Sequence, residues 1–108
     1  MTTPDQIRAS HILLMYAGSM RSTADRSQDD AESLIKQLKD QLTDGGNFRQ
    51  VAEENSDCPS GKSGGDLGAF GRGMMVPEFE QVAFALKVGE VSDVVETPFG
   101  YHIIRRNA

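Results

Sequence analysis

The chain has 108 residues, of which 38% are hydrophobic and 25% charged, a size and balance that fit one soluble domain with one modest core. Its net charge of −5 argues against a general binder of nucleic acids or anionic membranes, since such proteins carry a basic excess. The single cysteine excludes an internal disulfide, residues 1–5 lack signal-peptide character, and no apolar run approaches the length of a membrane span. We therefore expect a cytoplasmic monomer in which residues 1–108 form one domain, with a core at about residues 7–106.

The first half of the chain predicts a strand, a loop and two helices. Residues 9–15 form a short apolar run without breakers, typical of a buried strand, and the polar residues 17–26 indicate a loop. Ser27 can cap a helix that ends at the glycine pair 45–46, and Asn47 with Gln50 resembles a capping box for a shorter second helix. Their apolar faces are Ala31, Leu34, Ile35, Leu38 and Leu42 for the first helix, and Phe48, Val51 and Ala52 for the second.

The second half predicts a short strand, a helix and a hairpin. Residues 56–73 are rich in Gly, Ser, Asp and Pro, with a short strand at residues 67–70. Pro77 suits the first position of a third helix, which Gly89 is expected to end. The inner face of that helix would be Phe79, Val82, Ala83 and Leu86. Residues 91–96 and 101–105 indicate two strands joined by a tight turn at residues 97–100. This order predicts an α+β domain with a small, mostly antiparallel sheet.

Two histidines lie on predicted strands. Because side chains alternate across a strand, His11 shares a face with Leu13, and His102 shares a face with Ile104. If the first and last strands pair, the two imidazoles could lie side by side. The alternative is two independent histidines, each satisfied by backbone groups or water. The pattern of residues leaves both interpretations open.

Cys58 lies in the polar loop that follows the second helix. A lone cysteine is usually a small apolar residue, but this one has polar neighbours, so a Cys/His hydrolase is an alternative function. No oxyanion-hole motif or third orienting group supports that alternative. One cysteine and two distant histidines also lack the paired spacing of a zinc site.

The glycine-rich stretch around residues 64–73 contains no phosphate-binding motif. Neither Gly-x-x-x-x-Gly-Lys-Ser/Thr nor a Gly-x-Gly-x-x-Gly between a strand and a helix is present. The glycines are therefore expected to permit turns around a cleft, and no cofactor is expected. Met75 and Phe79 lie next to this stretch, and they suit either the core or a plastic apolar pocket. Periodicity alone favours the core for Phe79.

Taken together and in order, six blocks of sequence resemble the parvulin family of peptidyl-prolyl cis/trans isomerases, or rotamases. The resemblance covers residues 7–105, and the blocks are Ala9-Ser10-His11-Ile12-Leu13, Ser56-Asp57-Cys58-Pro59-Ser60-Gly61, Gly64-Gly65-Asp66-Leu67-Gly68, Met75-Val76-Pro77-Glu78-Phe79, Gly89-Glu90-Val91-Ser92 and Phe99-Gly100-Tyr101-His102-Ile103-Ile104. Any one block is a weak signal, whereas all six in this order are specific. The chain is similar to single-domain bacterial or archaeal members of the family.

The resemblance implies a fold, an activity and a set of site residues. The fold is a four-stranded antiparallel sheet surrounded by helices, with the two histidines adjacent on its central strands. The activity is rotation about Xaa-Pro peptide bonds, assisting protein folding, and the alternative is a chaperone-like peptide-binding module with little catalysis. The catalytic residues carried over are His11, Cys58, Thr97 and His102. The substrate-binding residues are Leu67, Met75 and Phe79, with Phe99 as a further wall of the cleft.

Two departures from the family pattern bear on substrate choice. Phosphate-directed parvulins carry a basic cluster after the first strand, whereas residues 17–26 hold only Arg21 and Arg26, separated and beside Asp25. We therefore expect unphosphorylated proline-containing polypeptides as substrates, with an apolar residue before proline. Phe99 replaces a frequent serine, which removes one hydroxyl from the hydrogen-bond network that the resemblance implies.

Overall fold

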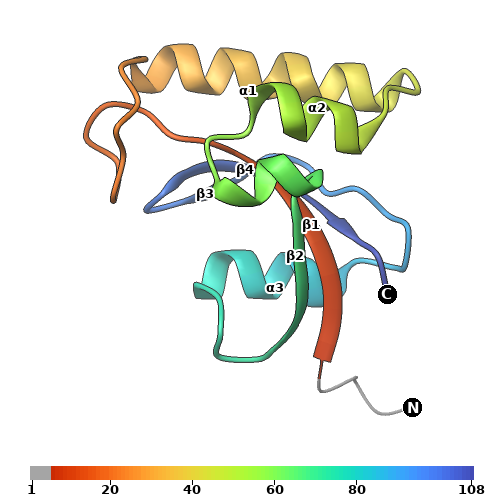
Figure 1. Cartoon of the computed structure of the whole chain (residues 1–108). Helices are drawn as coiled ribbons and strands as arrows, with labels where there is room; N and C mark the ends of the chain where they lie inside the picture. Colours follow the sequence, from red (N-terminus) through yellow and green to blue (C-terminus); the bar gives the residue numbers. More distant parts are fainter. Residues whose placement is uncertain (1–5) are drawn as a thin grey trace.

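A single antiparallel sheet of four strands organises the molecule. The structure is a computed structural model that describes residues 6–108, so the N-terminal stretch used above to argue against a signal peptide lies outside the described residues. The strands are β1 (Gln6–Leu14), β2 (Asp66–Gly71), β3 (Val95–Thr97) and β4 (Gly100–Arg106). Their order in the sheet is β2-β1-β4-β3, which places the first and last strands together at its centre (Figure 1). The predicted α+β class and antiparallel sheet are confirmed.

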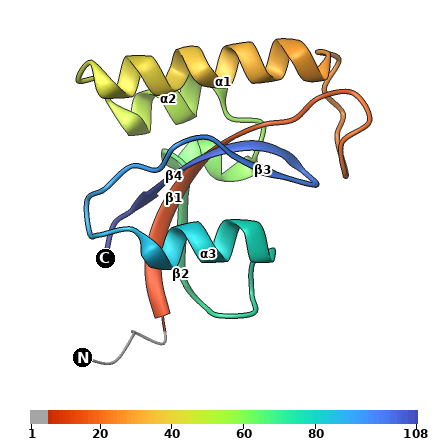
Figure 2. The same cartoon turned by 180° about the vertical axis from the view of Figure 1, so that it is seen from behind.

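Helices cover both faces of the sheet. The helices α1 (Gln28–Thr43) and α2 (Phe48–Asn55) lie together on one face, and α3 (Pro77–Ala85) lies on the other, as Figures 1 and 2 show from opposite sides. A short 3₁₀ helix, η1 (Pro59–Ser63), connects α2 to β2 and was not predicted. Among residues 6–108, no helix combines the length and apolar character needed to cross a bilayer.

Alternation along the central strands divides the core into two clusters. Ile12 and Ile103 point to the α1/α2 face, where they pack with Ile35 and Phe48. Residues of the opposite parity, such as Ile104, point to α3 and belong to a second cluster, which consists of Ile7, Ala9, Phe70, Phe79, Ala83, Phe84, Leu86 and Ile104. Each face of the sheet therefore has its own apolar layer, and the histidines lie on the α3 side.

Two of the predicted helix starts are present in atomic detail. The Ser27 hydroxyl accepts a hydrogen bond from the backbone N–H of Asp30, and the Asn47 side chain accepts one from the N–H of Gln50. Each bond satisfies a donor that the first turn of a helix leaves free. The Gln50 amide donates to Glu54 at 3.1 Å, so the expected capping box is made in one direction only.

Two predictions in the second half are wrong in their bounds. The strand expected over residues 91–96 is reduced to a single bridge at Val91 and the short β3. The ladder is interrupted because the Ser92 hydroxyl accepts the backbone N–H of Ile104 at 2.9 Å, where a strand carbonyl would otherwise accept it. The third helix ends at Ala85, before Gly89, which instead adopts a positive φ of 87° in the following turn.

Gly65 has no room for a side chain, and its location makes this important for the site. Its φ is +86°, and a Cβ atom there would lie 2.3 Å from the carbonyl oxygen of His11. The backbones of the two residues are also joined directly, because the His11 N–H donates to the Gly65 oxygen at 2.9 Å. Gly73 has a φ of +84° but no atom within 4 Å of an added Cβ, so it provides a matched control.

We expect Gly65→Ala to destabilise the protein much more than Gly73→Ala. The control should cost about 1 kcal/mol for its positive φ alone, whereas the backbone clash at Gly65 should add at least about 2 kcal/mol. Urea unfolding of both variants measures the difference. Equal free energies of unfolding for the two variants would contradict the proposed close approach.

Candidate active site

The pairing of β1 with β4 brings His11 and His102 together. In the register of this pair, His11 lies opposite Ile104 and Leu13 lies opposite His102, so the histidines are diagonal neighbours on one face. Their Nδ1 atoms are 3.0 Å apart, and the rings are stacked with centroids 5.2 Å apart. Both side chains are buried, with 5% and 4% of their surface exposed. Of the two interpretations of the strand histidines, the adjacent pair is confirmed.

Thr97 extends this pair into a chain of hydrogen bonds. Its hydroxyl oxygen lies 2.7 Å from His102 Nε2 and also accepts the backbone N–H of Phe99 at 3.2 Å. Thr97 is itself buried at the end of β3, beside the turn that leads into β4. Thr97, one of the residues that the resemblance implied, is therefore bonded to His102, and this bond fixes the orientation of that ring.

Burial keeps both imidazoles neutral. Desolvation lowers the pKa of His11 from 6.5 to about 4. Desolvation, followed by repulsion from His11, lowers the pKa of His102 from 6.5 to about 3. For the two Nδ1 atoms to form a hydrogen bond, one must carry a proton and the other must accept it. If both rings were charged, both Nδ1 atoms would be donors and could not bond to each other. At neutral pH the pair therefore offers a polar but uncharged surface.

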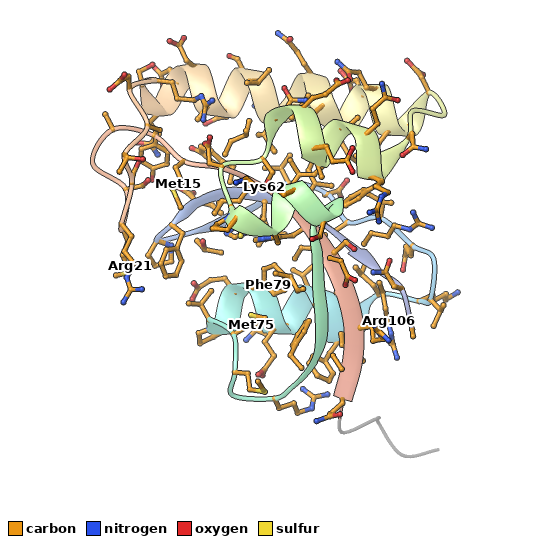
Figure 3. The ribbon with its side chains drawn as sticks, in the orientation of Figure 1. Met15, Arg21, Lys62, Met75, Phe79 and Arg106 are labelled. Carbon is orange, nitrogen blue, oxygen red and sulfur yellow. The ribbon has the colours of Figure 1, made fainter. Side chains whose placement is uncertain are left out.

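An apolar cavity of about 470 Å³ opens beside the histidines, within the range of ligand sites in proteins. It contains seven of the eight side chains that the family resemblance implied, namely His11, Cys58, Leu67, Met75, Phe79, Phe99 and His102. Phe79 meets the rings of His11 and His102 edge-on, with centroids 5.6 and 5.4 Å away. Figure 3 shows Phe79 and Met75 across from the loop that carries Arg21. Thr97 supports the cavity from behind and does not line it.

Cys58 stands at the rim of this cavity, immediately before η1. Its sulfur accepts a hydrogen bond from the Ser60 hydroxyl at 3.1 Å. Within residues 6–108 no hydrogen bond joins this sulfur to either histidine, so the nucleophile–base contact of a Cys/His hydrolase is missing. In the same part of the chain, no three His, Cys, Asp or Glu side chains gather as metal ligands would.

Several lining residues were not predicted from the sequence. Leu13, Met15, Met74 and Val76 add to the apolar wall, and Arg21 is a charged residue at the cavity. Leu13 could have been found, because it lies two residues from His11 on the same strand face. Arg21 carries no such signal: it reaches the cavity through a loop in which it adopts a positive φ of 59°.

The two loop arginines have separate environments. Arg26 is paired with the carboxylate of Asp57, while Arg21 borders the cavity. They therefore do not form a joint cluster of free cations.

Comparison with known proteins agrees with this geometry. Residues 1–107 match the family model described as the PPIC-type PPIase domain. The sequence is 44% identical over 119 residues to peptidyl-prolyl cis-trans isomerase Pin1 of Arabidopsis thaliana, covering 100% of both chains. It is 46% identical over 101 residues to foldase protein PrsA of Geobacillus kaustophilus, covering 93% of this chain and 31% of PrsA.

A solved structure supports the same assignment. Peptidyl-prolyl isomerase ESS1 from Candida albicans superposes with a TM-score of 0.89 at 37% identity, over 96% of this chain and 63% of that one. The sequence match, the shared fold and the buried histidine pair support the same family assignment. The chain belongs to the parvulin, or PPIC-type, family of peptidyl-prolyl cis/trans isomerases, and it is an enzyme of that class.

Proposed function

We propose that the enzyme holds the proline ring of an unphosphorylated substrate in the apolar cavity and favours the twisted form of the preceding peptide bond. The observation that carries this proposal is an apolar cavity of about 470 Å³, large enough to hold a proline ring, built on an uncharged histidine pair. Leu67, Met75 and Phe79 would grip the ring, and Phe99 would form a further wall.

The physical task is to lower a rotational barrier without making or breaking a bond. Resonance in the C–N bond gives rotation a barrier of about 18–20 kcal/mol. A site that binds the twisted amide more tightly than either planar isomer reduces this barrier. Fixing the ring in a rigid cavity while the other side of the bond rotates meets that requirement, and it needs no cofactor.

Cys58 and the histidines would then serve as polar surroundings for the rotating carbonyl. Cys58 lies at the rim with its sulfur already bonded to Ser60, which suits an electrostatic role better than nucleophilic attack. His11 and His102 would form the floor behind Phe79, fixed by Thr97. In this mechanism the imidazoles shape the cavity and transfer no proton.

The preference before proline is proposed to be apolar. A phosphate bound at that position needs several cations or donors, and Arg26 is committed to Asp57. Met15, which is bonded to this ion pair through its backbone, also lines the cavity, and methionine accepts varied apolar groups. Arg21 alone would give an acidic residue a weaker advantage.

A protease-coupled assay on a panel of Xaa-Pro peptides tests the proposed function. We expect acceleration with leucine or phenylalanine before proline, a smaller effect with glutamate, and no advantage for phosphoserine. Rates equal to the uncatalysed ones for every peptide would reject isomerisation. Binding without acceleration, seen as chemical-shift changes with slow exchange between isomers, would favour the peptide-binding module instead.

Removing the histidine pair tests its role as a floor. We expect the double variant His11→Ala, His102→Ala to lose about 10- to 100-fold in kcat/KM, since a buried network of hydrogen bonds is worth roughly 1–3 kcal/mol. The wild-type enzyme should show no solvent deuterium isotope effect, because no proton moves during rotation. Full activity in a folded double variant would exclude a catalytic contribution from the pair, and a large isotope effect would contradict the mechanism.

The lowered pKa values make stability depend on pH in a defined direction. The unfolded chain binds protons at both imidazoles near pH 6.5, whereas the folded chain excludes them until about pH 4 for His11 and about pH 3 for His102. Stability should therefore fall as the pH drops below 6.5, by roughly 2 to 3 kcal/mol per pH unit around pH 5 from the pair. The double alanine variant should lack this part of the slope, and identical slopes for both proteins in urea unfolding would refute the assignment.

A further inference from the structure

β1 continues past the end of its pairing with β2. There, loop segments form hydrogen bonds with the edge of β1 that β2 leaves uncovered. The N–H of His11 donates to the Gly65 oxygen at 2.9 Å. The N–H of Leu13 donates to the Ser56 hydroxyl at 3.0 Å, and the Leu13 oxygen accepts the N–H of Asp57 at 2.7 Å. The segment that carries Cys58 is thus attached to β1 in the manner of a neighbouring strand.

An ion pair continues this attachment at Met15, the residue after the strand. The N–H of Met15 donates to Asp57 Oδ2 at 2.8 Å, and the Met15 oxygen accepts Arg26 Nη1 at 3.1 Å. The same Arg26 nitrogen donates to Asp57 Oδ2. Both polar groups of one backbone unit are therefore bound by a single carboxylate–guanidinium pair, whose side chains are only 26% and 29% exposed.

Arg26 also closes the loop formed by residues 17–26. Its carbonyl oxygen accepts the N–H of Ala17 at 2.8 Å, which joins the two ends of the loop. At the far end of the loop, the N–H of Met20 donates to the Pro98 oxygen at 2.9 Å. This bond places the loop against the turn that carries Phe99, and it leaves Arg21 beside the cavity (Figure 3).

The loop is attached to the rest of the molecule mainly by these polar contacts. No residue between 17 and 26 belongs to either apolar cluster of the described chain. Releasing the ion pair would therefore loosen the loop while the sheet and helices stay packed. Charge-assisted hydrogen bonds of this kind are stronger than neutral ones, and partial burial protects them from screening.

We propose that Arg26 and Asp57 are positioning residues that set the enzyme's selectivity for the residue before proline. They act by fixing the loop of residues 17–26 over the cavity, next to Met15 and Arg21. The floor that holds the proline ring is built by other elements, so it stays in place without them. This inference rests on the proposed function for its kinetic consequence, but the fixed loop can be observed without catalysis.

The test compares Arg26→Met, Asp57→Asn and their combination with the wild type. These substitutions keep most of the side-chain volume and remove the charges. Lys36→Met is the matched control, because it removes the cation of an exposed ion pair with Glu32 on α1, away from the cavity. Arg26→Lys retains the charge and should restore part of the wild-type behaviour. The readouts are kcat/KM over the Xaa-Pro panel and the amide exchange rates of Ala17 and Met20.

We expect the ratio between the best and worst peptides to shrink by about fivefold in each single variant, the size of a lost charge-assisted contact. The double variant should be no worse than either single one, because both changes break the same unit. The Ala17 and Met20 amides should exchange at least about tenfold faster, while core amides keep their protection. Lys36→Met should change none of these values.

Two results would overturn the inference. One is unchanged selectivity and unchanged Met20 exchange in Arg26→Met. The other is an equal loss for all peptides, which would assign the pair a general structural role. If the wild-type enzyme accelerates no peptide, the proposed function fails, and the exchange rates alone then decide whether the ion pair fixes the loop.

Discussion

The antiparallel pairing of β1 with β4 is the constraint on which the active site depends. Its register brings His11 and His102 onto the same face, and strand alternation directs that face toward α3. A slip of one residue would pair His11 with Ile103 or Arg105, which would place the two imidazoles on opposite faces of the sheet and break up the floor of the cavity. Thr97 on β3 bonds to His102, and Phe79 on α3 packs against its ring. Neither contact could bring the two histidines together without the strand register.

Neutrality of the histidines follows from the same burial that makes the cavity apolar. A charged imidazole in this layer would lose its hydration without gaining a counter-ion, so both rings remain uncharged at neutral pH. An uncharged floor is compatible with a hydrophobic proline ring, whereas a charged one would retain water beside it. Polar orientation and apolar binding coexist because the two Nδ1 atoms bond to each other and His102 Nε2 bonds to Thr97. Within the described residues, His11 Nε2 is buried without a hydrogen-bond partner.

Local features could be predicted from the sequence where a short-range rule decides them. The caps at Ser27 and Asn47 and the start of α3 at Pro77 are of this kind. The pairing of the terminal strands could not be derived from periodicity, because alternation defines a face without naming the neighbouring strand. The family resemblance supplied that step. Neither periodicity nor the family resemblance predicted the ion pair of Asp57 with Arg26, because it joins two loops 31 residues apart through their side chains. Ser92 likewise ended a predicted strand by a side-chain bond that no propensity describes.

The pairing of β1 with β4 also determines when, during synthesis of the protein, the sheet can form. It joins residues 9–14 to residues 101–106, so the sheet cannot close until residues 101–106 are available. Contacts of such long sequence separation slow folding, because a large loop must be closed before any of them forms. On the ribosome β1 emerges well before β4 and must wait for this partner to be translated. An enzyme that assists other chains in reaching their native state therefore completes its own sheet only after residues 101–106 have been synthesised.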